Sequence, residues 1–352
     1  MILCAAAVMS LQAQHFMYPD VTGKKPGMNL VETSTSRVTV EYAVPEFTME
    51  DLVVNGATMK NIQLPGTFLF NDEGMPNLPG KGGYIAIPQG AVAKLRIVSE
   101  KTDIIHNVEI APAPRIPLDS DKNPLEYTPD PSVYFRNAYY PASPVQLSEV
   151  THIRGVDVVI LGVTPFQYNP VTKDLIVYKE LQVEVVFEGG NGQFGDQAYR
   201  NRWWDPILQD NIMNYSQLPV IDYNARLTTY SDNVLNDECE YIIICPTGPA
   251  FQSWADSIRR FRLEQGILTK VFPVDAIGGN TTTAIEAFID NAYNTWTIKP
   301  AACLMLGDYG NDATKNLISP MLPHSGGYPN FASDNKYADV TNDNLPDRKS
   351  VV

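Results

Sequence analysis

Three short apolar runs alternate with two segments of helical periodicity between residues 241 and 306, and this order constrains the fold most strongly. The runs are Tyr241–Cys245, Leu268–Pro273 and Cys303–Leu306. An uninterrupted apolar run of this length is typical of a strand that is covered on both faces. The two intervening segments carry the apolar stripes Phe251, Trp254, Ala255, Ile258, Phe261 and Ile285, Phe288, Ile289, Ala292, Tyr293, Trp296. A strand–helix–strand–helix–strand order predicts a parallel sheet with right-handed crossovers, and therefore an α/β domain.

The ends of these two helices are also marked in the sequence. Gly266 follows the first stripe at a position where a left-handed residue ends many helices. Asn280 or Thr281 precedes the second stripe, and either side chain can cap a helix.

Residues 15 to about 190 follow a different pattern, with frequent proline and glycine and short runs that alternate between apolar and polar residues. Examples are Val38–Tyr42, Tyr84–Pro88 and Ala93–Val98. Two longer runs within 156–188 are joined by the polar turn Asn169–Asp174. Period-two alternation with many turn residues predicts antiparallel strands packed as a β-sandwich.

We therefore predict a multidomain chain in which a β-sandwich-like domain precedes an α/β domain with a parallel sheet. Residues 1–14 are interpreted as a signal peptide, which lacks a basic leading segment and is cleaved after Ala13. Attachment of a lipid at Cys4 is the alternative interpretation of this segment. The β-rich domain covers 15–218 and includes a short amphipathic helix within 197–218, 219–239 is a polar linker, and the α/β domain covers 240–352, where it appears truncated.

The composition restricts the partners that the chain can bind. Forty acidic and 26 basic residues give a formal net charge of −14, which disfavours nucleic acid and anionic membranes as partners. After the leader, no stretch reaches the roughly 18 apolar residues of a transmembrane span. The four cysteines follow no metal-ligand spacing and do not imply a disulfide framework.

Carboxylates indicate one candidate site. Asp308 directly follows the third strand, and ligands of open parallel sheets gather outside the carboxyl ends of strands. The segment Ser333–Asp347 carries Asp334, Asp339, Asp343 and Asp347 among several asparagines. Dense Asp and Asn loops supply the oxygen ligands of Ca²⁺, although this spacing is not that of an EF-hand. A solvated acidic loop, with Asp308 capping a turn, is the alternative.

No complete catalytic constellation can be assembled from these residues. His324 is the only histidine in the second half, and Ser325 beside it lacks a supporting acid. Cys245 and Cys303 fall inside predicted strands, where a thiol is buried and unreactive. The turn Pro246–Pro249 lacks the glycine spacing that binds phosphate, which weighs against a nucleotide-binding enzyme.

The second half resembles the start of the gingipain-like cysteine peptidase domain. The matching stretches are EYIIICPTG, WADSIRRFRLEQGILTKVFPVDAIGG, TTAIEAFIDNAYNTW, CLMLGDYG and SDNKYADVTNDNLPD. The upstream region, especially Pro165–Pro170 through Phe187, is similar to the β-rich prodomain of that family. The resemblance implies a caspase-like fold and peptide hydrolysis by a Cys–His dyad, in which a thiolate attacks the scissile carbonyl.

In that family the two dyad residues lie downstream of the segment that matches Ser333–Asp347, so the resemblance assigns no catalytic residue to these 352 positions. It does imply a structural Ca²⁺ site, with side-chain ligands at Asp308, Asp343 and Asp347. The backbone carbonyls of Thr341 and Leu345 are further expected ligands.

The resemblance predicts a precursor fragment of a secreted or surface-located bacterial endopeptidase that acts on proteins or peptides. Its prodomain is expected to contact the catalytic domain, to inhibit it and to assist its folding. Arg226, in the polar linker, is the candidate processing site, and the alternative is an ordinary linker arginine. A non-enzymatic exported binding protein with a degenerate peptidase domain is the competing function.

Overall fold

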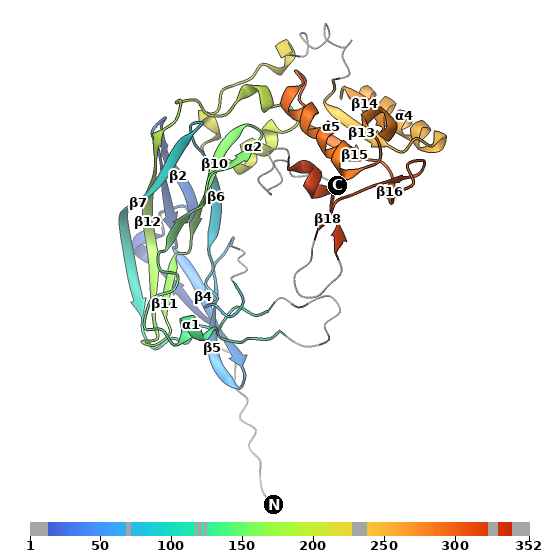
Figure 1. Cartoon of the computed structure of the whole chain (residues 1–352). Helices are drawn as coiled ribbons and strands as arrows, with labels where there is room; N and C mark the ends of the chain where they lie inside the picture. Colours follow the sequence, from blue (N-terminus) through green and yellow to red (C-terminus); the bar gives the residue numbers. More distant parts are fainter. Residues whose placement is uncertain are drawn as a thin grey trace, which may run out of the picture. The chain divides into compact units, whose positions relative to one another are not determined.

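The computed structural model describes residues 13–67, 72–115, 117, 122, 125–226, 238–322 and 330–339. Two compact units emerge from the contacts within the chain (Figure 1). The first unit consists of Met1–Thr151, Val158–Gln193 and Asn211–Gln217, and the second of His152–Asp157, Phe194–Asp210 and Leu218–Val352. The second unit therefore includes two short segments that precede the predicted linker.

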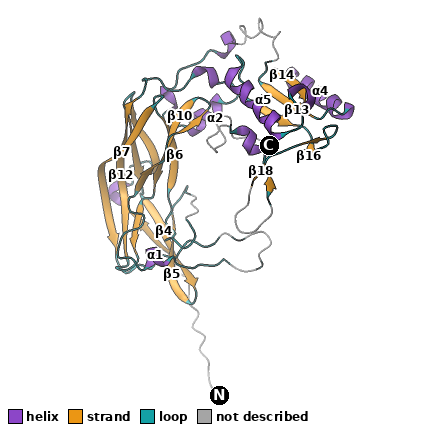
Figure 2. Ribbon diagram, in the orientation of Figure 1, coloured by secondary structure: helices purple, strands orange, loops and turns teal. Residues whose placement is uncertain are grey.

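The first unit is built from antiparallel strands, as predicted (Figure 2). Its strands are β1 (Ala13–Met17), β2 (Gly27–Thr33), β3 (Arg37–Ala43), β4 (Glu46–Val54), β5 (Ala57–Gln63), β6 (Lys81–Ala86), β7 (Ala91–Ile105), β8 (Val145–Leu147), β9 (Thr151–Ile153), β10 (Val156–Val163), β11 (Phe166–Asn169) and β12 (Asp174–Gly189). The hairpin end of β9 and β10, His152–Asp157, belongs to the second unit. One sheet has the order β11-β12-β3-β2, with β7 paired along β12. The other two have the orders β1-β4-β5 and β6-β10-β8. A single helical turn, α1 (Pro131–Tyr134), begins at a cap in which Asp130 accepts a hydrogen bond from the Ser132 amide.

The core of this unit lies between the sheets. Along β12 the buried positions alternate with partly exposed ones, so one face of the strand is apolar and the other is polar. Phe47 of β4 stacks on Phe16 of β1, with ring centroids 4.7 Å apart, and meets the edge of Phe166 of β11 at 5.2 Å. These ring contacts join two of the sheets face to face, which is the arrangement of a β-sandwich.

The second unit contains the predicted parallel sheet. Its order is β14-β13-β15, formed by β13 (Tyr241–Cys245), β14 (Thr269–Pro273) and β15 (Ala302–Met305). Helices α4 (Pro249–Glu264) and α5 (Thr282–Thr295) are the two crossovers. Alternate residues of β13 face opposite layers: Ile243 packs with Ala255 of α4, and Ile242 packs with Ile285 of α5.

The predicted helix ends are confirmed. Gly266 has a φ of +76°, the left-handed conformation that side chains with a Cβ avoid. The Thr281 side chain accepts a hydrogen bond from the Ala284 amide and caps α5. Among the described residues, no helix is both long and apolar enough to cross a membrane.

The short amphipathic helix predicted within 197–218 is α2 (Asp205–Asn211), and the same range also contains single 3-10 turns at Gln197–Tyr199 and Tyr215–Gln217. At its start, the Asn201 side chain accepts hydrogen bonds from the amides of Trp203 and Trp204 and holds a turn. At its end, Met213 donates its amide to the Tyr84 carbonyl at 2.9 Å. Pairing with a neighbouring strand therefore replaces the next helical turn.

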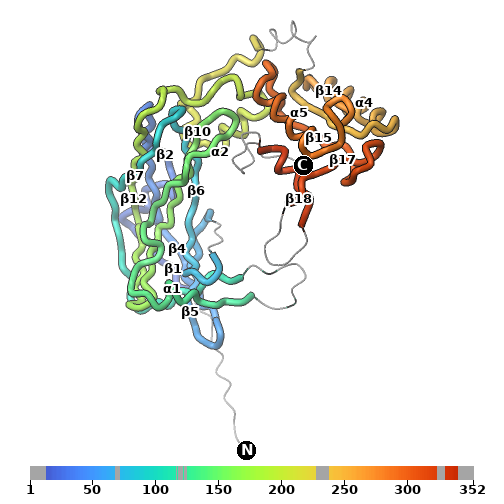
Figure 3. The backbone as a smooth tube through the Cα atoms, in the orientation of Figure 1, coloured from blue at the N-terminus to red at the C-terminus, as the bar shows by residue number. Residues whose placement is uncertain are grey.

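Short elements complete the second unit beyond β15, as the backbone tube shows (Figure 3). They are the paired strands β16 (Asp308–Tyr309) and β17 (Asn316–Leu317), the paired strands β18 (Met321–Leu322) and β19 (Phe331–Ala332), and a 3-10 helix at Asp334–Ala338.

Candidate functional site

The carboxyl ends of the parallel strands are partly covered by the loop that follows β15. Thr247, two residues beyond β13, donates its amide and its hydroxyl to the Ala313 carbonyl at 2.8 and 3.0 Å. Gly248 lies so close to this loop that an added Cβ would come within 2.1 Å of the Thr314 carbonyl oxygen. Glycine is therefore required at position 248 for the loop to take this position.

Asp308 lies at this edge of the sheet, where the sequence places it. Its side chain is exposed, and its Oδ1 accepts a hydrogen bond from the Tyr309 amide at 2.8 Å. The other two predicted side-chain ligands, Asp343 and Asp347, lie outside the described residues, as do Thr341, Leu345, His324 and Ser325.

Two further carboxylates of the predicted acidic loop are described, and both bind protein groups. Asp334 accepts a hydrogen bond from the Ser319 hydroxyl. The side chain of Asp339 is buried, 3.5 Å from the Lys336 Nζ. Within the described residues, no three His, Cys, Asp or Glu side chains are grouped to hold a metal ion. The Ca²⁺ site therefore stays a prediction that depends on residues 340–352.

Two buried thiols of the second unit, Cys239 and Cys245, are not activated. Cys239 and Cys245 are buried, and Cys303 is half-buried. Burial raises the pKa of Cys239 to about 12 and that of Cys245 to about 11. Since the thiolate is the nucleophile in cysteine peptidases, neither buried thiol can act as one near neutral pH.

A buried arginine lies at the tip of the β9–β10 hairpin, and the sequence did not indicate its contacts. Arg154 and Gly155 have φ values of +54° and +75°, as in a tight two-residue hairpin turn. The Arg154 side chain is almost completely buried, and its Nη1 and Nη2 donate to the carbonyls of Pro300 and Ala301, both at 3.1 Å. Its guanidinium lies over the rings of Trp204 and Tyr293, at 4.9 and 5.6 Å from their centroids.

Two side chains from the segment before α2 also bind residues of the parallel-sheet region. The Trp204 indole Nε1 donates to the Ala301 carbonyl at 2.9 Å. Arg202 Nη2 lies 3.0 Å from Oε2 of Glu240, whose side chain is only 4% exposed, and also donates to the Gly266 carbonyl. The Glu240 carboxylate also accepts a hydrogen bond from the Leu268 amide at 3.2 Å.

Arg226 does not extend freely into solvent. Residues 223–226 form one helical turn, and Arg226 donates from Nη1 to the Arg200 carbonyl at 2.9 Å and from Nη2 to the Gln197 carbonyl at 2.7 Å. Arg200 is paired with Asp205, which also accepts the Tyr223 hydroxyl at 2.6 Å. We refer to Arg200, Asp205, Tyr223 and Arg226 as the Asp205 cluster.

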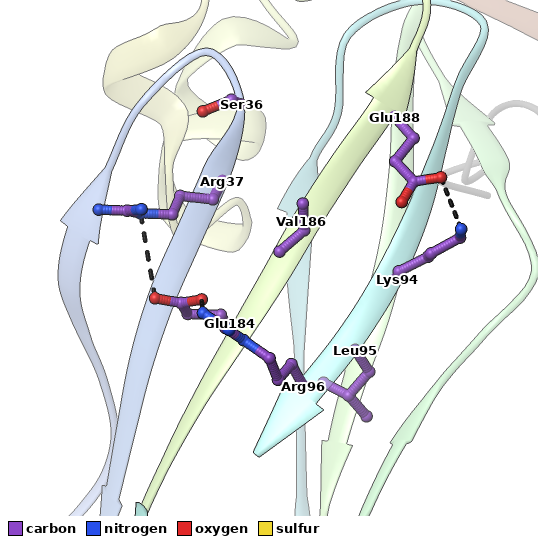
Figure 4. Close-up of a pocket in the computed structure, with 8 residues that line it drawn as sticks. All are labelled: Ser36, Arg37, Lys94, Leu95, Arg96, Glu184, Val186 and Glu188. Carbon is purple, nitrogen blue, oxygen red and sulfur yellow. Dashed lines mark hydrogen bonds and ion pairs between the residues drawn. The ribbon is translucent and has the colours of Figure 1, made fainter. Parts of the chain in front are cut away.

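The first unit carries a shallow hollow on the polar face of the large sheet, shown in Figure 4. Its lining residues are Ser36, Arg37, Lys94, Leu95, Arg96, Glu184, Val186 and Glu188. The charged groups neutralise one another across strands: Glu184 binds Arg96 and Arg37, and Lys94 lies 2.6 Å from Glu188. Such cross-strand pairs stabilise a solvated sheet face, and Glu32, which lies outside the hollow, pairs with Arg37 at 3.4 Å as well, so each charged group of the hollow has an opposite charge beside it.

Comparison with known proteins gives two adjacent family matches. The family model Propeptide_C25 matches residues 18–218, and the model of Peptidase family C25 matches residues 235–349. Arg154, Arg202 and Trp204 therefore belong to the propeptide match, whereas Glu240, Gly266 and Ala301 belong to the peptidase match.

Among curated relatives, Lys-gingipain of Porphyromonas gingivalis is 23% identical over 279 residues, which are 77% of this chain and 16% of the relative. Gingipain R2 of Porphyromonas gingivalis is 24% identical over 336 residues, or 92% of this chain and 43% of the relative. Gingipain R1 is 30% identical over 325 residues, or 90% of this chain and 31% of the relative. The chain thus spans less than half the length of each of these relatives.

The matching solved structures are also from Porphyromonas gingivalis. The complex of the RgpB pro- and mature domains matches with a TM-score of 0.49 and 23% identity, over 55% of this chain and 100% of the matched chain. A structure on the zymogenic latency of gingipain K matches with a TM-score of 0.43 and 22% identity, over 51% of this chain and 100% of the other.

Proposed function

Since the chain belongs to the gingipain-like cysteine peptidases of family C25, we propose that it is the front part of the zymogen of an exported bacterial cysteine endopeptidase. The propeptide and the start of the peptidase domain follow one another in the order expected of a precursor. The observation that carries the proposal is the second compact unit. In it, segments of the propeptide match, 152–157 and 194–210, pack together with the peptidase match.

In this proposal the propeptide assists folding of the peptidase segment and inhibits it. Glu240, at the start of β13, is a buried carboxylate whose ion-pair partner is Arg202 of the propeptide match. A buried charge that loses its partner is strongly destabilising. Without the propeptide, the parallel sheet of the peptidase segment would therefore be less stable. This is expected if the propeptide acts as an intramolecular chaperone.

Hydrolysis is assigned to residues beyond those that the structure describes. A cysteine peptidase needs a thiolate and an imidazole within reach of each other. The high pKa values of the Cys239 and Cys245 thiols support a dyad located elsewhere, downstream of the segment that matches Ser333–Asp347. Its substrates would be proteins or peptides, and its location the cell surface or the medium.

The direct test compares the 352-residue chain with the product of the complete gene, both assayed on a mixture of fluorogenic peptides. We expect hydrolysis by the complete product after maturation and none by the 352-residue chain. Hydrolysis by the shorter chain would contradict the location of the dyad. A complete product that cleaves no peptide, at any stage of maturation, would contradict the peptidase function.

We also propose the structural Ca²⁺ site at Asp308, Asp343 and Asp347. Its support is the exposed position of Asp308 at the carboxyl edge of the sheet, together with the oxygen-rich composition of the loop. A ligand that binds only the native state raises the melting temperature. Millimolar Ca²⁺ should do so for the wild-type chain but not for Asp308→Asn, and an unchanged wild-type melting temperature would count against the site.

Arg226 is proposed as the processing site, because it lies in the polar linker 219–239, between the propeptide match and most of the peptidase match. Cleavage there would give a mature chain that begins at Leu227. Sequencing the amino terminus of material processed by the complete enzyme tests this assignment, and a start well away from Leu227 would exclude it.

A further inference from the structure

Two methionine side chains of the first unit meet beside Gly83. A Cβ added to Gly83 would lie 2.8 Å from the Sδ of Met28 and 2.8 Å from the Sδ of Met213. The two sulfurs therefore face one point beside the Gly83 backbone, and they are no further apart than twice this distance. Because glycine has no side chain, that point stays open. Both methionines are partly exposed, so an ion can reach them from the solvent.

The methionine pair lies where the edges of two sheets adjoin. Met28 is on β2, an outer strand of the large sheet, and Gly83 is on β6, an outer strand of the sheet β6-β10-β8. β2 and β6 contact one another. Met213 comes from the segment that follows α2, and all three residues belong to the first unit. Three segments that are distant in sequence thus bring two sulfurs to one glycine.

The backbone that carries each methionine is held by hydrogen bonds. Met213 donates its amide to the Tyr84 carbonyl at 2.9 Å. The next residue, Asn214, is fully buried, and its side chain donates to the Ala86 carbonyl and accepts from the Ala86 amide, both at 2.8 Å. Met28 is held by the pairing of β2 with β3. A ligand of the two sulfurs would therefore meet a frame that is already ordered, which lowers the entropy cost of binding.

Two converging thioethers are a donor set for a soft monovalent cation. Thioether sulfur is polarisable and uncharged, and soft sulfur ligands select Cu(I) over the ions that carboxylates prefer. A thioether has no proton to release, so its binding of a metal ion does not compete with protons as binding by a thiolate or an imidazole does.

We propose that Met28 and Met213 form a binding site for Cu(I), with their Sδ atoms as ligands and with Gly83 keeping the space between them open. The site belongs to the first unit, and its occupation requires no peptide hydrolysis. It is therefore independent of the proposed precursor function.

The experiment uses the 352-residue chain labelled with ¹³C at the methionine methyl groups and follows their NMR resonances. Ag(I) is the first probe, because it has the charge and softness of Cu(I) and is stable in air; Cu(I), kept reduced with ascorbate under nitrogen, is the second. The resonances of Met28 and Met213 should shift together with either ion. Met17, which is 59% exposed on β1, should not shift. The shifts should be the same at pH 5 and at pH 8.

Met28→Leu and Met213→Leu each remove one sulfur and nearly conserve the volume of the side chain. Each should lower the affinity for Ag(I) by about tenfold or more, measured on the methyl group of the methionine that remains. Gly83→Ala keeps both sulfurs but places a methyl group at the point that they face, so it should weaken binding as well. Met17→Leu is the matched control and should leave the affinity unchanged. Circular dichroism of each variant verifies that it is folded.

Resonances of Met28 and Met213 that do not shift with Ag(I) would overturn the proposal. So would shifts of equal size at Met17, or folded leucine variants that bind Ag(I) as tightly as the wild type. Shifts with Ag(I) but not with Cu(I) would overturn the assignment to Cu(I). The described cysteines belong to the second unit, so ions that bind their thiols are distinguished by the methionine resonances.

Discussion

The guanidinium of Arg200 and the carboxylate of Asp205 form a two-point ion pair inside the second unit. Nε lies 2.9 Å from Oδ1 and Nη2 lies 2.7 Å from Oδ2, and the Arg200 side chain is 1% exposed. The remaining nitrogen, Nη1, donates to the Pro219 carbonyl at 2.6 Å. This pair therefore fixes the beginning of the linker to the segment before α2.

Replacing Asp205 should destabilise the second unit strongly. Asp205→Ala leaves a guanidinium buried without its carboxylate, and the loss of one partner of a buried pair costs about 3–5 kcal/mol. Urea unfolding followed by Trp fluorescence measures the change, since Trp204 lies in this unit. Asp256→Ala is the control, because Asp256 pairs with Arg259 and Arg260 on the surface of α4, and exposed pairs contribute about 1 kcal/mol or less. Equal effects of the two substitutions would contradict the structural role of Asp205.

The same cluster should slow cleavage by a trypsin-like protease after Arg226, the proposed processing site. A trypsin-like protease needs an extended chain with a free arginine side chain, whereas Arg226 lies in a helical turn and donates to two carbonyls. Tyr223→Phe removes the hydroxyl that binds Asp205 and loosens this turn. Cleavage by trypsin after Arg226, followed by mass spectrometry, should then be several-fold faster than in the wild type.

Tyr309→Phe is the control for this prediction, since the Tyr309 side chain is half-exposed and distant in sequence from the cluster. Cleavage at sites in the first unit provides an internal reference for protease activity. If Tyr223→Phe and the wild type are cut after Arg226 at the same rate, the cluster does not protect this bond.

The strands and helices of the parallel sheet could be predicted from sequence because each of their signals is local. The apolar run Tyr241–Cys245 coincides with one strand, β13. Gly266 and Thr281 mark helix ends within one turn of their own positions. Helical crossovers make the three strands parallel, but the pattern does not show that β13 lies in the centre, between β14 and β15.

The position of Arg154 could not be predicted in the same way. Its acceptors, Pro300 and Ala301, lie 146 and 147 residues further along the chain. The sequence shows only an Arg-Gly pair between two strands, which indicates a hairpin turn and gives no information about what the arginine contacts. Contacts formed across such a separation depend on the completed fold.

For the candidate cation site, only the place of Asp308 can be compared with the prediction, because Asp343 and Asp347 lie outside the described residues. Asp308 is placed by the end of a strand, so its location follows from the sheet. The sequence predicts a loop around Asp343 and Asp347, and periodicity does not encode the contacts that position a loop carboxylate.

The outer face of the large sheet should lose part of its stabilisation in acid. The Lys101 hydrogen bond, together with the charges of Lys24 and Lys101, holds the pKa of Glu180 below its ordinary value. A carboxyl group with a lowered pKa contributes stability that is fully present above its unfolded pKa of about 4.3 and is lost as the pH falls through the folded value. Lys101→Met should therefore lower the urea midpoint of the first unit at pH 7, by the equivalent of about 1 kcal/mol or less.

At pH 3 the difference in urea midpoint between Lys101→Met and the wild type should be smaller, because Glu180 is then increasingly protonated in both. Lys25→Met serves as a control for the change in net charge. If the difference in urea midpoint grows toward low pH, the Lys101–Glu180 ion pair is not the source of the difference.

The buried thiols give a last test of the proposed location of the catalytic cysteine. Cys239 and Cys245 are buried, and their raised pKa values mean that less than about 1% of either thiol is ionised at pH 8. Iodoacetamide reacts with thiolates, so both residues should remain unmodified in the folded chain at pH 8 and become modified in urea. Peptide mass spectrometry identifies the modified position, and the half-buried Cys303 provides a comparison of intermediate access within the same chain. Rapid modification of Cys245 in the folded protein would indicate an activated thiol at the carboxyl edge of the sheet, and the dyad would then have to be sought within this segment.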